Sequence, residues 1–153
     1  MRAKVRSFCA LSLILAAMAV SAHAKQMAVV VDKTNNLGGL TAQELAKVFK
    51  FDNRKWPDGR NVVLVMRDPS SPEMRDALEK LYHMQPDELK TLIAAHRSEV
   101  IIVDSEEKLL QSVQSIPGAI GLVDVYSITG GVNVLKVDGK LPLQPGYLLK
   151  GTQ

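Results

Sequence analysis

Short runs of β-branched and other apolar residues recur along the chain, and each run is closed by polar or turn-forming residues. Runs of this length and composition are typical of buried β-strands. We therefore predict strands at five places: 27–31, 62–66, 100–103, 119–123 and 132–137. Within these strands we expect buried side chains at 29–31, 63–65, 101–103 and 120–123.

Between these runs, the apolar residues recur at a helical spacing instead. The clearest example follows Ser71, where positions i, i+3, i+4, i+7 and i+8 are apolar: Met74, Ala77, Leu78, Leu81 and Tyr82. Thr41 and Glu44 match a capping box, which predicts the start of an earlier helix. Two later helices are expected to begin at Pro86 and after an Asp104 cap.

Strands that alternate with helices are typical of an α/β domain whose sheet is covered on both faces. The 153 residues are enough for one domain, and no repeat, low-complexity tract or linker divides them. We therefore predict a single α/β domain with a mixed sheet of about five strands and helices on both faces.

The first 24 residues differ in composition from the rest of the chain. Basic residues at positions 2, 4 and 6 precede an apolar stretch at 8–20, and Ala22 and Ala24 place small side chains before Lys25. This is the pattern of a cleaved secretory signal peptide, and the stretch is shorter than the roughly 20 residues that span a bilayer. We divide the chain into a signal peptide, 1–24, and a domain, 25–153. We expect a periplasmic protein without a membrane span in the mature chain.

This division predicts a mature protein that begins at Lys25 and carries no lipid. The only cysteine, Cys9, lies inside the signal peptide, so the mature chain has no disulfide and no thiolate. Mass spectrometry of protein taken from the periplasm should find a chain that starts at Lys25. A mature chain that still contains Cys9 would contradict the division.

The distribution of charge argues against a nucleic-acid partner. The formal net charge is +3, but three of the 19 basic residues and none of the 16 acidic ones lie before position 25. Residues 25–153 therefore carry 16 basic and 16 acidic side chains. Domains that neutralise many phosphates are normally basic, so we expect no nucleic-acid binding.

No residue pattern in the sequence indicates catalysis, a cofactor or a bound metal ion. His83 and His96 lie 13 residues apart, with no carboxylate at ligand spacing. The serines form no Gly-x-Ser-x-Gly elbow and no Ser-x-x-Lys motif, and no glycine-rich phosphate loop precedes a lysine. We therefore expect a protein that is not an enzyme and uses no cofactor or metal.

The segment from Arg67 to Glu73 stands between a predicted strand end and a predicted helix start, where α/β sheets hold ligands. A helix N-terminus attracts anions; Arg67 adds a guanidinium, and Ser70 and Ser71 add hydroxyl groups. A structural interpretation also fits, in which Ser71 only caps the helix and Arg67 pairs with Asp68 or Glu73. The residue types by themselves favour this structural interpretation.

Trp56 begins a turn with proline at its second position and Gly59 at its fourth. A tryptophan at such a turn either anchors it in the core or contacts a partner. We expect the core position, with the partner contact as the alternative.

Three stretches of the sequence carry a family resemblance. They are Leu-Thr-x-x-Glu-Leu-x-x-Val-Phe from Leu40, Lys-Trp-Pro-Asp-Gly-Arg from Lys55, and Val-x-x-Ile-Pro-Gly-Ala-Ile-Gly-Leu-Val from Val113. Together with Arg67 and Ser71, they resemble the periplasmic phosphate-binding (PstS-like) proteins of ABC transporters, especially short single-lobe relatives. The resemblance extends over 27–149 and implies the fold of one lobe of a type II periplasmic binding protein.

The sequence departs from this family at the phosphate motif. In the full-length binders, the arginine is followed after three residues by Ser-Gly-Thr, which holds phosphate. Here Pro72 replaces the glycine and Glu73 replaces the threonine. Proline removes a backbone donor, and a carboxylate repels an anion at short range. The full-length binders also close a second lobe over the ligand, whereas one lobe leaves it open to water.

The resemblance implies a solute-binding domain that binds phosphate or another oxyanion weakly, through Arg67, Ser70 and Ser71 beside Glu73. The expected protein partner is a transporter or another envelope protein. The alternative is an interaction module of the cell envelope, derived from a binding-protein lobe that has lost its ligand. Thermal melting with and without millimolar phosphate separates the two, because selective binding to the folded state raises the midpoint.

Overall fold

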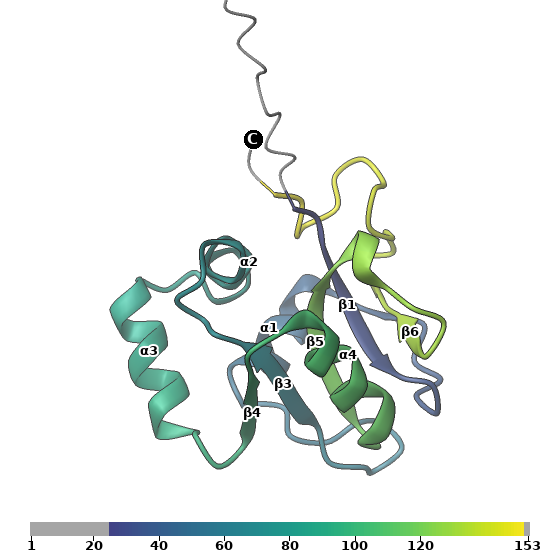
Figure 1. The fold of residues 1–153 in the computed structure, drawn as a ribbon, viewed down its shortest axis with the longest axis horizontal. Coiled ribbons are helices and arrows are strands. Elements are labelled where there is room, and N and C mark those ends of the chain that lie inside the picture. The colour runs from purple at the N-terminus through teal and green to yellow at the C-terminus, as the bar shows by residue number, and fades with distance from the viewer. Residues whose placement is uncertain (1–24, 152–153) are drawn as a thin grey trace, which may run out of the picture.

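The computed structural model describes residues 25–151. The predicted signal peptide, 1–24, lies outside these residues and stays a prediction. The elements follow in this order (Figure 1): β1 (Met27–Asp32), β2 (Gly39–Leu40), α1 (Ala42–Phe49), β3 (Val63–Arg67), α2 (Pro72–Tyr82), α3 (Pro86–Ala95), β4 (Val100–Val103), α4 (Glu106–Ser115), β5 (Ala119–Asp124), the 3₁₀ turn η1 (Val125–Ser127), β6 (Val132–Val134) and β7 (Lys136–Val137).

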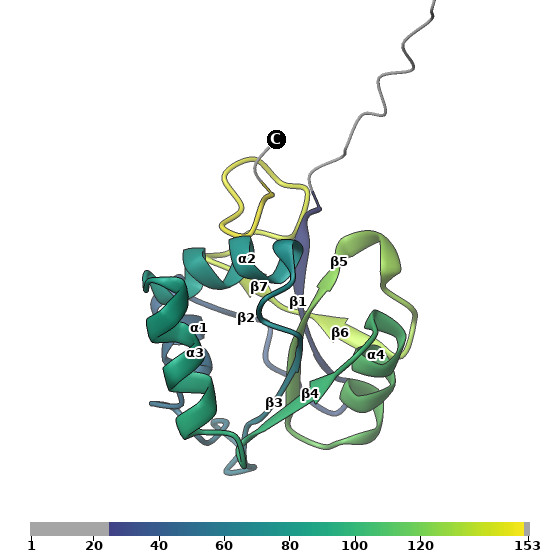
Figure 2. The same ribbon diagram turned by 60° about the vertical axis from the view of Figure 1, so that its left-hand side comes forward.

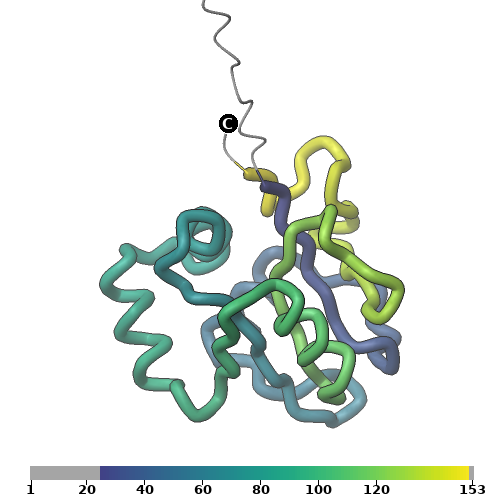
Figure 3. Tube along the Cα trace, in the orientation of Figure 1, coloured from purple at the N-terminus to yellow at the C-terminus, as the bar shows by residue number. Residues whose placement is uncertain are grey.

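Five strands form one mixed sheet in the order β4-β3-β5-β1-β6, which confirms the predicted sheet. β3 runs parallel to β4 and β5, whereas β1 runs antiparallel to β5 and β6. Figure 3 shows β1 and β5 side by side although they are far apart in the sequence. The ends of β3, β4 and β5 therefore meet the start of β1 at one end of the sheet, which we name the Arg67 end. The opposite end, where β1 finishes, is the Asp32 end.

Helices cover both faces of the sheet, as predicted. Figure 2 shows α1, α2 and α3 on one side of the sheet and α4 on the other. Successive side chains of a strand point to opposite faces, so Val29 and Val31 pack under α1–α3 while Ala28 and Val30 pack under α4. All four side chains are fully buried. An inner strand covered on both faces is apolar at every position, which explains the continuous run at 27–31.

Val63 was expected to be buried but is only partly buried, and two larger details of the strand prediction are wrong. The side chains at 101–103 were expected to be buried, but β4 is an edge strand and Ile101 is 36% exposed; only Val100 is buried. The predicted strand at 132–137 is divided, because β6 pairs with β1 whereas β7 pairs with β2 in a separate two-stranded sheet. Strand order decides both outcomes, and strand order is a long-range property.

The helix starts agree with the local pattern to within one residue. The Thr41 side chain accepts a hydrogen bond from the Glu44 N–H at 3.1 Å, and the Glu44 carboxylate accepts one from the Thr41 N–H at 2.8 Å. The predicted capping box is therefore confirmed. At α4 the cap is Ser105 rather than Asp104: the Ser105 hydroxyl accepts a hydrogen bond from the Lys108 N–H at 3.2 Å, and the Asp104 carboxylate pairs with the Lys108 ammonium at 2.7 Å.

Trp56 is a core anchor, which confirms the expected position over the alternative of a partner contact. Its ring is 3% exposed, and its indole N–H donates to the carbonyl of Gly118 at 2.8 Å. Gly118 has a φ of +85°, and a Cβ there would lie 2.2 Å from the carbonyl oxygen of Asn61. Only glycine fits this crossing of two loops.

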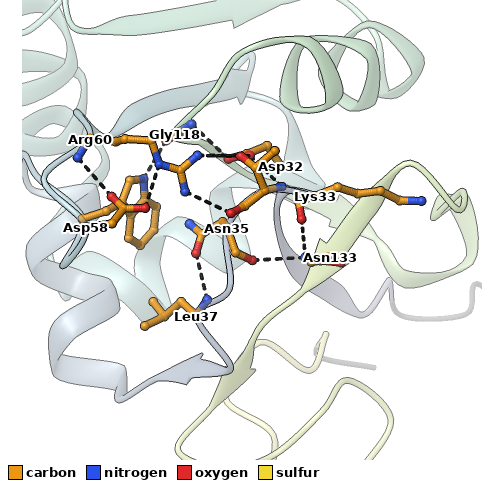
Figure 4. A network of polar contacts seen from close by, with 10 residues as sticks. Asp32, Lys33, Asn35, Leu37, Asp58, Arg60, Gly118 and Asn133 are labelled. Atoms are coloured by element: carbon orange, nitrogen blue, oxygen red, sulfur yellow. Dashed lines mark hydrogen bonds and ion pairs between the residues drawn. The ribbon is translucent and has the colours of Figure 1, made fainter.

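A polar network surrounds the end of β1 (Figure 4). The Asp32 carboxylate is 3% exposed; it accepts hydrogen bonds from the N–H groups of Thr34 at 3.0 Å and Gly118 at 2.9 Å, and from the Thr34 hydroxyl. The guanidinium of Arg60 forms an ion pair with the same carboxylate, with 3.4 Å between Nη1 and Oδ1. Burial by itself raises the pKa of Asp32, but these hydrogen bonds and the Arg60 charge outweigh it, so the pKa lies below its ordinary value. The network ties three loops together at the Asp32 end.

Candidate functional site

Arg67 is the last residue of β3 and lies half-buried at the Arg67 end of the sheet. Within residues 25–151, its guanidinium forms no hydrogen bond and no ion pair with another side chain. Arg67 therefore forms no close ion pair with Asp68 or Glu73, although its charge still lowers the pKa of Glu73. A half-buried guanidinium without a hydrogen-bonded partner among the described residues keeps its N–H donors available to an external acceptor.

The loop between Arg67 and α2 is held by Asp68. The Asp68 carboxylate accepts hydrogen bonds from the N–H of Ser70 at 2.9 Å and from its hydroxyl at 2.7 Å. These bonds, and to a lesser extent the charge of Lys90, place the pKa of Asp68 below its ordinary value. The Ser71 N–H donates to the Asp68 carbonyl at 3.1 Å. Ser70 therefore stabilises the loop. Its hydroxyl can donate to a ligand only if its hydrogen bond to the Asp68 carboxylate breaks.

Ser71 occupies the N-cap position of α2, as the sequence predicts, but its side chain makes no capping hydrogen bond. Its hydroxyl oxygen is buried and has no hydrogen-bond partner among the described residues. A buried hydroxyl without a partner is costly, and such a group is expected to find an acceptor or donor. Ser71 thus stands at a helix start with an unused hydroxyl, one loop away from the unpaired Arg67.

Glu73 lies in the first turn of α2, after Pro72, and folds back on the helix start. Its carboxylate accepts a hydrogen bond from its own backbone N–H and lies 3.3 Å from the ammonium of Lys25. The pKa of Glu73 is lowered, mainly by the hydrogen bond from this backbone N–H and then by Lys25. The charge of Arg67 lowers it further. The carboxylate is therefore ionised at neutral pH and takes the place that an external anion prefers at a helix N-terminus.

Lys25 is the residue of this site that the sequence pattern does not indicate. It precedes β1 and is 48 positions from Glu73. The two meet because β1 runs antiparallel to β5, which brings the start of β1 to the Arg67 end. No local motif carries this information.

The assembled groups suit the binding of an anion rather than of a metal. Arg67, Lys25, the Ser71 hydroxyl and the N–H groups of α2 are all donors. Of the two nearby carboxylates, Asp68 is engaged by Ser70 and Glu73 by Lys25. Within residues 25–151, no group of three His, Cys, Asp or Glu side chains is placed to hold a metal ion. His96 has a structural role, since its ring stacks on the ring of Phe51 with 4.3 Å between the ring centroids. In the same range, no helix is long and apolar enough to cross a membrane.

The sheet order and the two helical layers define the fold of one lobe of a type II periplasmic binding protein, the fold that the sequence resemblance implies. No family model matches the chain, and no curated protein matches it. Solved structures do share the fold. An ABC-type phosphate transport receptor from Vibrio cholerae has a TM-score of 0.71 and 18% identity, over 83% of this chain and 54% of that one.

Two further solved structures share the fold of this chain. PstS from Borrelia burgdorferi has a TM-score of 0.69 and 19% identity, over 85% of this chain and 56% of that one. A putative phosphate ABC transporter substrate-binding protein with bound phosphate, from Clostridium perfringens, has a TM-score of 0.64 and 21% identity, over 76% of this chain and 46% of that one. The chain thus spans about half the length of these proteins. The first is described as a transport receptor and the third as a substrate-binding protein.

Proposed function

We propose that this chain is a periplasmic solute-binding-protein-like domain that binds phosphate, or a similar oxyanion, at the Arg67 end of the sheet. The observation that carries the proposal is the Arg67 guanidinium, which has no ion-pair partner among the described residues. The unused hydroxyl of Ser71 at the start of α2 supports it. The neighbours in fold that are described as phosphate receptors favour phosphate among the oxyanions.

The binding should be weak. Pro72 offers no N–H at the first position of α2, and the Glu73 carboxylate already occupies the helix start. The described residues also form a single lobe, and a single lobe leaves a bound anion in contact with water. We expect a dissociation constant in the millimolar range, which corresponds to about 4 kcal/mol.

Replacing Glu73 with threonine should strengthen phosphate binding about tenfold. The change removes a like charge at short range and adds a hydroxyl donor. Isothermal titration calorimetry at one fixed, low salt concentration measures the effect, since exposed charges are screened by salt. The matched control is Glu79→Thr, which makes the same change on an exposed residue of α2. Equal affinities for the two variants would contradict the proposal.

The second candidate function is an interaction module of the cell envelope that no longer binds a small ligand. Tyr126 favours it, because its ring is 79% exposed on the turn η1, at the same end of the sheet as Arg67. Tyrosine and arginine are common among the residues that dominate protein interfaces. If millimolar phosphate leaves the melting midpoint unchanged, this second candidate takes precedence.

A further inference from the structure

We propose that Lys25 is the second cation of the oxyanion site, and that its ammonium passes from Glu73 to the anion when the anion binds. The inference rests on the proposed function, because it adds a binding residue to the same site. It assigns a ligand contact to a residue that neither the local sequence pattern nor the phosphate motif includes.

Lys25 lies at the Arg67 end of the sheet, close to the start of α2. The register of β1 against β5 pairs Met27 with Asp124, so the residues before Met27 lie at the Arg67 end of the sheet. From there the Lys25 ammonium reaches across to the first turn of α2 and lies 3.3 Å from the Glu73 carboxylate. The pair is partly exposed, with 40% of the Lys25 side chain and 37% of the Glu73 side chain accessible. A partly exposed ion pair is weak and exchanges partners readily.

The Glu73 carboxylate is shared by two cations. Lys25 and Arg67 both act electrostatically on Glu73, although Lys25 precedes β1 and Arg67 ends β3. The same carboxylate also accepts the free N–H at the start of α2. Glu73 therefore takes the contacts that an oxyanion would make: a helix N–H, an ammonium and a nearby guanidinium.

The lysine side chain is able to change its partner. An ammonium has three donors on a flexible stem, and the contact with Glu73 uses one of them. An oxyanion bound near Ser71 carries more charge and more acceptor oxygens than one carboxylate. Lys25 can therefore follow the greater charge without any change of the backbone.

The test separates a direct contact from mere neutralisation of Glu73. It uses the Glu73→Gln protein, in which the competing carboxylate is absent. In that background, Lys25→Gln should weaken phosphate binding about tenfold, as expected for the loss of a charge-assisted hydrogen bond. The control is Lys33→Gln, which removes the same charge from an exposed lysine that follows β1 at the Asp32 end. Phosphate titrations, followed by NMR shifts of the backbone amides at positions 71 and 73, measure these three proteins and the wild type at one salt concentration.

Each outcome decides the question. Weaker binding for Lys25→Gln, with unchanged binding for Lys33→Gln, supports the direct contact. Equal affinities of the two lysine variants in the Glu73→Gln background overturn it, because Lys25 then serves only to neutralise Glu73. If neither the wild-type nor the Glu73→Gln protein binds phosphate, the proposed function itself fails, and the role of Lys25 fails with it.

Discussion

Replacing Arg67 with alanine should remove measurable phosphate binding. A guanidinium and an oxyanion form the strongest attractive contact that this site offers. Such a contact contributes about 1.5–3 kcal/mol, or roughly a tenfold to hundredfold change in affinity. From a millimolar starting value, that loss moves the dissociation constant beyond the range of calorimetry. The control is Arg97→Ala, an exposed arginine after α3 that lies outside the proposed site.

The melting temperature of the Arg67→Ala protein distinguishes a binding role from a structural one. Arg67 forms no ion pair within the described part of the chain, so its removal should change the midpoint little in the absence of phosphate. Wild-type protein should gain stability from millimolar phosphate, and the variant should not. A variant that loses stability without phosphate, and keeps the phosphate response, would show that Arg67 serves the fold.

Replacing Asp32 with asparagine should destabilise the fold by about 3 kcal/mol, which lowers the melting midpoint by about 10 °C for a domain of this size. The carboxylate accepts backbone hydrogen bonds from Thr34 and Gly118 and neutralises Arg60. An asparagine amide would place its NH₂ group against the backbone N–H of Thr34 or Gly118, so one of these hydrogen bonds would be lost. Arg60 would also lose its buried, negatively charged partner. Thermal melting at neutral pH measures the change.

Asp58→Asn is the matched control for this prediction. Asp58 also pairs with Arg60, at 2.7 Å, but half of its side chain is exposed. Exposed ion pairs contribute little to stability, so the Asp58 variant should melt close to the wild-type protein. Equal losses for the two variants would mean that the ion pair with Arg60 matters and the burial of Asp32 does not.

The contribution of Asp32 should also depend on pH in a definite direction. Its pKa in the folded protein is lowered, whereas an unfolded aspartate titrates near 3.9. The carboxylate therefore stabilises the fold fully above about pH 4, and this stability is lost as the pH falls through the lower, folded-state pKa. The difference in stability between the wild-type and Asp32→Asn proteins should shrink in that acidic range. A difference that stays constant from pH 7 to pH 2 would contradict the lowered pKa.

The local features of the fold were predictable because each depends on residues close together in the sequence. The apolar runs place the inner strands, and the i, i+3, i+4 spacing from Met74 places α2. The capping box of Thr41 and Glu44 is complete within four residues. The position of Arg67 and Ser71, at a strand end followed by a helix start, is local for the same reason.

The candidate site was predictable only in part. Sequence reasoning finds Arg67, Ser71 and Glu73, because they belong to one continuous segment. It expects Ser71 to cap the helix, whereas the hydroxyl makes no such hydrogen bond. It also offers Arg67 two acidic partners, and Arg67 acts on one of them, Glu73, only through its charge. Lys25 does not enter that reasoning, because its contact with Glu73 depends on how β1 is placed in the sheet.

The sequence by itself determines the α/β class of this protein, the approximate bounds of its inner strands and helices, and the strand–helix junction that carries Arg67. Only the tertiary structure decides that β4 is an exposed edge, that 132–137 is shared between two sheets, and that Lys25 meets Glu73. The physical reason is the distance along the chain between the residues that interact. Hydrophobic periodicity and capping act over a few residues, whereas strand order sets contacts between residues that are distant in the chain.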